Sequence, residues 1–187
     1  CYQRMIEETG LDLSHAHLGF GWASLRSHDN EQGLRSFQES LQLRQRHLPQ
    51  DHLHVAEVYS FLGETHRKMQ QFDEALSYLK KAIDIEEKHL PDSSSNLAAT
   101  YETIGCIYTT MEEYDTAQTF FENVLKIRQK IFPDNHPRIA NSYNNLGWLF
   151  EEKKEYETSI SFYDISLKIA KETLPPTHRL VTSTKQA

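Results

Sequence analysis

The feature that most constrains this chain is a repeat with a period of 42 residues. Four prolines stand 42 positions apart, each after a large apolar residue, in the pairs Leu48-Pro49, Leu90-Pro91, Phe132-Pro133 and Leu174-Pro175. The same shift aligns a column of glycines, namely Gly21, Gly63, Gly105 and Gly147. Because independent columns keep one register without an insertion, the chain is expected to fold as a stack of like units.

Within each unit the apolar residues follow a helical period. In the second unit, Val55, Tyr59, Leu62 and His66 share one face, which predicts a first helix over residues 53–69. A second apolar stripe predicts a helix over 72–89, and the proline that follows cannot continue it. The register predicts four complete repeats, over residues 11–52, 53–94, 95–136 and 137–178. Residues 1–10 are expected to be the end of a preceding repeat, and residues 179–187 the truncated start of a further one.

Composition and charge argue against several functional classes. A formal net charge of −7 disfavours a nucleic acid or an anionic membrane surface as the partner. No apolar run reaches the length of a membrane span. Two cysteines make no disulfide framework, which favours a reducing, cytoplasmic location. The chain starts at Cys1 without a signal-peptide pattern, as expected of a segment of a longer protein.

The repeat columns resemble those of the tetratricopeptide family. The third unit carries the aromatic, Leu-Gly-like, aromatic and small or apolar positions of that pattern as Tyr101, Ile104-Gly105, Tyr108, Ala117, Phe121 and Val124. The long period, the apolar-Pro-x-x-His links and the run Ile139–Gly147 are similar to the variety found in kinesin light chains. This resemblance implies an all-α, right-handed superhelical solenoid of antiparallel helix pairs, whose first helices line a concave groove that binds peptides.

On the tetratricopeptide pattern, side chains of the first helices face this groove. We call the following set the predicted groove residues: Trp22, Arg26, Glu57, Ser60, Glu64, Arg67, Glu102, Cys106, Asn141, Asn144, Asn145 and Trp148. Trp22 and Trp148 share one column, and each either packs on a neighbouring helix or anchors an apolar side chain of a ligand. The three asparagines share a helix face, and a primary amide can both donate to and accept from a peptide backbone.

The charges of the groove predict the kind of segment that it accepts. When Lys68, Glu151 and Glu152 are counted together with the predicted groove residues, five acids stand against three bases, a formal balance of −2. We therefore expect a neutral or mildly basic segment that carries one large apolar anchor. Asn144 and Asn145 are expected to hold its backbone.

Histidines and a cysteine invite other hypotheses. His52, His136 and His178 recur one per unit, too far apart to share a metal ion, so a turn hydrogen bond or a helix-start role is the better interpretation. The residues one helical turn from Cys106 include no base or cation that would activate its thiol. The sequence therefore predicts no catalytic residue, no metal site and no cofactor.

Taken together, these features predict a protein-interaction module, a scaffold or adaptor rather than an enzyme, that holds a protein or peptide ligand. The alternative is a regulatory or oligomerising segment of a larger multidomain enzyme, because similar arrays are often attached to catalytic domains. In that case the array would contact its own chain or a second copy, so self-association stays open.

Overall fold

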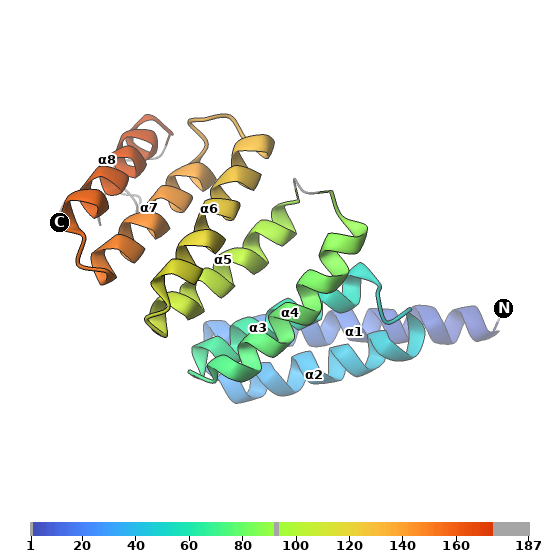
Figure 1. Cartoon of the computed structure of the whole chain (residues 1–187). Coiled ribbons are helices and arrows are strands. Elements are labelled where there is room, and N and C mark those ends of the chain that lie inside the picture. The colour runs from blue at the N-terminus through green and yellow to red at the C-terminus, as the bar shows by residue number, and fades with distance from the viewer. Residues whose placement is uncertain (1, 92–93, 174–187) are drawn as a thin grey trace. The chain divides into compact units, whose positions relative to one another are not determined.

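The computed structural model describes residues 2–91 and 94–173 of the chain. These residues form eight α-helices and no strand (Figure 1). The helices are α1 (Tyr2–Arg26), α2 (Asn30–His47), α3 (Leu53–Lys68), α4 (Phe72–His89), α5 (Ser95–Thr110), α6 (Tyr114–Ile131), α7 (Pro137–Glu152) and α8 (Tyr156–Thr173). The predictions for Leu174, Pro175, His178 and residues 179–187 lie outside the described residues.

The chain divides into two compact units, residues 1–89 and 90–187. In the first unit α1 packs on α2, α2 on α3 and α3 on α4, and the second unit follows the same order from α5 to α8. The helices predicted over 53–69 and 72–89 agree with α3 and α4 to within one residue. α1 runs without a break from Tyr2, whereas the sequence predicted the end of a preceding repeat over residues 1–10. The repeat boundaries themselves stay predictions.

The turn inside each helix pair has one backbone geometry. One residue per turn takes a left-handed conformation, with φ of 60° to 64°, at His28, Gln70, Glu112 and Lys154. The N–H of the next residue then reaches back to close the helix, as when Gln71 donates to the carbonyl oxygen of His66 at 2.9 Å. Because a left-handed conformation is unfavourable for any residue with a Cβ atom, tertiary packing must hold these turns.

Side chains cap the first helices at the loops between pairs. Nδ1 of His52 accepts the backbone N–H of His54 at 3.1 Å, and Nδ1 of His136 accepts that of Arg138 at 3.1 Å. Ser94 plays the same part for α5, accepting from Asn96 at 3.2 Å. The helix-start role predicted for His52 and His136 is therefore confirmed.

The two helices of each pair cross at the glycine column. A Cβ atom added to Gly21 would lie 2.7 Å from Cζ and 2.8 Å from Cδ1 of Phe37, whose ring is fully buried. An equally close approach brings Gly63 to Leu79, Gly105 to Phe121 and Gly147 to Tyr163. Cores form on either side of these crossings, around Leu62 in the first unit and Leu146 in the second.

The same substitution, made separately at two glycines of α1, tests this crossing. We expect Gly21→Ala to lower the free energy of unfolding by about 1–3 kcal/mol, because the added methyl overlaps the Phe37 ring. Gly19→Ala is the matched control, since its Cβ atom would meet nothing within 4 Å. It should raise the stability by about 0.5–1 kcal/mol through helix propensity. Urea unfolding followed by circular dichroism measures both, and equal effects would contradict the crossing.

Candidate functional site

Trp22 is the one aromatic residue among the predicted groove residues of the first unit. It is 43% exposed, and its ring meets that of Phe61 on α3 edge-on, with the ring centroids 5.0 Å apart. Gly19 stands one turn earlier on α1, and the position that a Cβ atom would take there has no neighbour within 4 Å. Trp22 therefore packs on the next first helix and still presents an open aromatic surface beside a residue without a side chain.

Glu57 is held by a buried arginine from a second helix. Its Oε2 atom accepts a hydrogen bond from Nη1 of Arg44 at 2.7 Å, and the Arg44 side chain is fully buried. Arg44 also donates from Nε to Oγ of Ser14 on α1 at 2.9 Å and from Nη1 to the carbonyl oxygen of His54. Because a guanidinium stays charged, Glu57 compensates the buried charge, and the network joins α1, α2 and α3.

The other polar groove residues of the first unit lie along α3 and at the end of α1. Glu64 accepts two hydrogen bonds from Arg67, both at 2.7 Å, so these two groove residues pair with each other. Ser60 is half-buried one turn before Glu64. Arg26 is exposed in the last turn of α1, where a cation suits the negative end of the helix.

In the second unit a buried arginine again binds a groove carboxylate. Arg128 of α6 donates to Glu102 of α5 at 2.6 Å and 3.1 Å, and only 4% of its side chain is exposed. The same guanidinium donates to Oγ of Ser142 on α7 at 3.0 Å. Nδ2 of Asn145 donates to Glu102 at 2.6 Å, so the structure brings two predicted groove residues together across α5 and α7.

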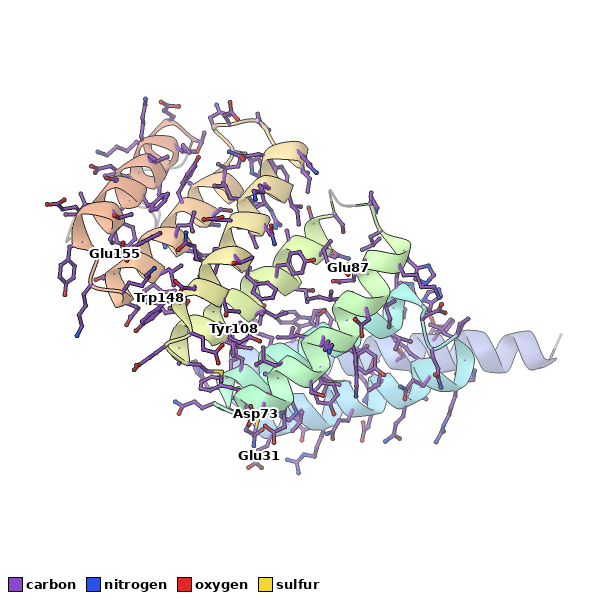
Figure 2. All side chains as sticks on the ribbon, in the orientation of Figure 1. Glu31, Asp73, Glu87, Tyr108, Trp148 and Glu155 are labelled. Atoms are coloured by element: carbon purple, nitrogen blue, oxygen red, sulfur yellow. The ribbon has the colours of Figure 1, made fainter. Side chains whose placement is uncertain are left out.

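Trp148 lies on α7 (Figure 2) and packs against an apolar cluster of the second unit that includes Phe121 and Leu146. Its ring is half-buried, and its Nε1 atom donates to Glu152 at 3.0 Å. Cys106, which is half-buried, and Tyr108 pack against the same cluster. Asn141 is exposed and Asn144 half-buried on the same helix.

These contacts change the charge that the first helices present. When Arg44 and Arg128 are included, three ion pairs carry no net charge, namely Arg44–Glu57, Glu64–Arg67 and Arg128–Glu102. The exposed charges that remain from the counted positions are Arg26 and Lys68 in the first unit and Glu151 and Glu152 in the second. Among the counted positions, two exposed bases therefore remain in the first unit and two exposed acids in the second.

Sequence reasoning missed both arginines because they stand on second helices. The signal was present in the apolar spacing, since Phe37, Leu41, Arg44 and Leu48 follow i, i+4, i+7 and i+11. Phe121, Leu125, Arg128 and Phe132 repeat that pattern two periods later. A cation inside an apolar stripe requires a buried anionic or carbonyl partner, which these two arginines find on the first helices.

Three histidines gather where α3 begins. The ring of His54 stacks on His52 at a centroid distance of 5.0 Å and meets the edge of His15 at 6.1 Å. Burial, and after it the charge of Arg44, lower the pKa of His54 below its ordinary value of 6.5. Among the described residues, no group of three histidine, cysteine or acidic side chains is arranged to hold a metal ion.

The columns, the crossings and the capped turns agree with a known repeat family. The family model described as tetratricopeptide repeat matches residues 14–88 and 96–178. The chain belongs to the tetratricopeptide repeat family. This family and its structural neighbours support a protein-interaction scaffold, and such arrays are typically not enzymes.

Solved structures show the same solenoid fold. BtubC (BKLC) from P. vanneervenii superimposes with a TM-score of 0.77 at 18% identity, over 88% of this chain and 65% of that protein. An array of nearly identical kinesin-light-chain-like TPR repeats from Podosopora anserina also gives 0.77, at 15% identity, over 91% of this chain and 81% of that one. The apo form of RapI gives 0.74 at 12% identity, over 87% and 57%. These matches confirm the all-α tetratricopeptide solenoid fold.

Two further findings bear on the chain's surroundings. No curated protein sequence matches it. None of the helices in the described part of the chain combines the length and apolar character that crossing a membrane requires.

Removing Glu102 should cost far more than removing Glu64. The two carboxylate side chains are similarly exposed, at 27% and 25%, but their arginine partners differ, at 4% for Arg128 and 33% for Arg67. We expect Glu102→Ala to lower the free energy of unfolding by about 3 kcal/mol, because it strands a buried charge. Glu64→Ala should cost about 0.5 kcal/mol or less. Adding Arg128→Met to Glu102→Ala should restore part of the loss, and denaturant unfolding that shows equal costs would contradict this account.

The lowered pKa of His54 predicts a loss of stability in mild acid. Above pH 6.5 the imidazole of His54 is neutral in both the folded and the unfolded chain. As the pH drops below 6.5, the unfolded chain takes up the proton before the folded chain does, so the free energy of unfolding falls. The effect should be small, because 53% of the His54 side chain is exposed. Thermal unfolding at pH 7.5 and at pH 5.5 (roughly one pH unit either side of the free value) measures it. His54→Gln should reduce the difference between the two melting temperatures, and an unchanged difference would exclude His54 as its source.

Proposed function

We propose that this chain is a scaffold or adaptor that binds a segment of a partner protein on the surface of its first helices. The observation that carries the proposal is the open aromatic surface of Trp22 beside Gly19. Apolar side chains that sit exposed next to an unfilled position are suited to receive a large side chain of a partner. Around them the polar groups already bind one another, as in Glu64–Arg67 and Arg44–Glu57.

In the first unit the proposed anchor site is formed by Trp22, Phe61 and Gly19. The edge-on contact between the two rings fixes the tryptophan, so that little side-chain entropy is lost on binding. Arg26 and Lys68 occupy the same column on α1 and α3, and both are exposed. An apolar anchor that is followed by an acidic residue therefore suits this unit better than the mildly basic segment expected from the sequence.

In the second unit the proposed contacts are Trp148, Asn141 and Asn144. The tryptophan offers a half-buried ring, and the two amides can donate to and accept from an extended backbone. Asn145 donates a hydrogen bond to Glu102, so we assign it to the contact between α7 and α5 rather than to ligand binding. Glu151 and Glu152 are exposed beside these residues and favour a basic residue in the segment that binds here.

The remaining properties follow from composition. With a formal net charge of −7, the partner is proposed to be a protein rather than a nucleic acid or a membrane surface. The two cysteines favour a reducing compartment, and we propose the cytoplasm.

The two tryptophans allow each unit to be tested by itself. Trp22 and Trp148 are the only two in the chain, so Trp148→Phe leaves Trp22 as the single reporter, and Trp22→Phe leaves Trp148. Peptides with one Phe or Leu anchor and either Glu or Lys beside it are titrated against both proteins. We expect the Glu peptide to change the fluorescence of Trp22 at the lower concentration and the Lys peptide to do so for Trp148.

Gly19→Leu is the substitution that should block peptide binding at the proposed anchor site of the first unit. It should weaken the best peptide of the first unit by about 1–2 kcal/mol, because the added side chain occupies the space beside Trp22. Its melting temperature should not fall, since that space is empty in the folded protein. Gly19→Ala is the control and should bind almost normally. Unchanged affinity in Gly19→Leu, or a Trp22 signal that responds to no peptide, would rule out this site.

A further inference from the structure

The second unit contains a surface cleft whose lining includes none of the predicted groove residues. Its volume is about 520 Å³, and it is formed by the end of α6, the loop that follows α6, and the helices α7 and α8. Its apolar wall consists of Ile139, Tyr143, Ile165 and Ile169. A cleft of this size, with an apolar wall and a few polar groups, is suited to receive a ligand group.

The first unit shows which side chain fills the corresponding place, which it builds from α2, α3 and α4 as the second unit builds the cleft from α6, α7 and α8. The rings of Tyr59 and Tyr78 have their centroids 6.1 Å apart, and Nζ of Lys81 stands 5.7 Å from the first and 5.3 Å from the second. Gln45 of α2 donates to the hydroxyl of Tyr59 at 3.1 Å. The chain itself therefore places a lysine ammonium over this pair of rings, where the π-electrons attract it.

The second unit keeps the pair of rings but has no lysine in that column. Tyr143 and Phe162 stand two periods after the tyrosines of the first unit, and their ring centroids are 6.2 Å apart. The position of Lys81 is taken by Ile165, which is 40% exposed. Because isoleucine is shorter than lysine and carries no charge, the ring of Tyr143 borders an open cleft without a cation from this column.

The polar rim of the cleft differs between the two units in the same sense. In the first unit Lys88 of α4 forms an ion pair with Asp51 of the loop before α3. Two periods later these positions hold Glu172 and Asn135, which cannot form an ion pair with each other. The charged residues that line the cleft are two acids and one base, namely Asp134, Glu172 and Lys168. The surplus of negative charge favours a cationic occupant.

We propose that this cleft binds a lysine side chain of a partner protein. The ammonium lies over the ring of Tyr143, as that of Lys81 lies over Tyr59, and the two carboxylates of the rim offset its charge. The methylene chain of the lysine packs on Ile165 and Ile169. The partner is thus a protein segment with an exposed lysine, and its contact does not depend on the groove proposed above.

Short peptides test the cleft in solution. Peptides with blocked ends that differ only in a central lysine, glutamine or norleucine are titrated against the isotope-labelled 187-residue chain, and its backbone amide signals are followed by nuclear magnetic resonance. We expect the lysine peptide to shift the signals of Tyr143 and Ile169 with a dissociation constant of about 0.1–1 mM, because one side chain makes a small contact. The glutamine and norleucine peptides should bind roughly tenfold more weakly, because neither carries a cation.

Ile165→Lys is the decisive variant, because it gives the cleft the lysine that the first unit has in this column. It should weaken binding of the lysine peptide by about tenfold or more. Ile160→Lys is the matched control, since it makes the same substitution in another exposed isoleucine of α8 that is not part of the cleft lining, and it should bind normally. Circular dichroism establishes that each variant folds. If Ile165→Lys unfolds, the double variant Asn135→Asp with Glu172→Lys replaces it, because it recreates the ion pair of the first unit.

A chain whose cleft signals respond to no peptide overturns the proposal. Equal binding of the lysine and norleucine peptides overturns it too, because the occupant would then be an apolar side chain. Signals of the cleft that shift with protein concentration alone would assign it to a second copy, and a lysine peptide that binds Ile165→Lys unchanged would place the peptide elsewhere. Either result also overturns the proposal. The tests of Trp22 and Gly19 concern the first unit, so their outcome is independent of this one.

Discussion

The close approach of paired helices at the glycine column sets the geometry on which the rest of the structure depends. At Gly21 the backbone of α1 comes so near to the Phe37 ring that a single methyl group would overlap it. This contact fixes how far each first helix lies from its second helix. It also decides which side chains of the second helix reach the neighbouring first helices, and the other three pairs make the same approach.

Buried arginines are the main consequence of that geometry. Arg44 and Arg128 occupy apolar positions of the second helices and extend to carboxylates on the first helices. A buried guanidinium is costly without a partner, so Glu57 and Glu102 are drawn into internal pairs. The surface that remains combines the exposed ring of Trp22 and the half-buried ring of Trp148 with exposed charges at the ends of the first helices. A surface of this kind is suited to hold a partner by an apolar anchor and to select it by the charge beside the anchor.

The sequence by itself determined the period, the helix pairs and the capped starts of α3 and α7. Those features rest on local interactions, such as apolar spacing within a helix, proline at a helix end and a side chain that caps an N–H two residues away. Only the tertiary structure decided which of the predicted groove residues are exposed and which bind side chains of other helices. The partners of Glu57 and Glu102 come from other helices, and Asn145 meets Glu102 from 43 residues away. The charge count made from the sequence left out Arg44 and Arg128 for that reason: ion pairs depend on distances between helices, and the crossing at glycine sets those distances.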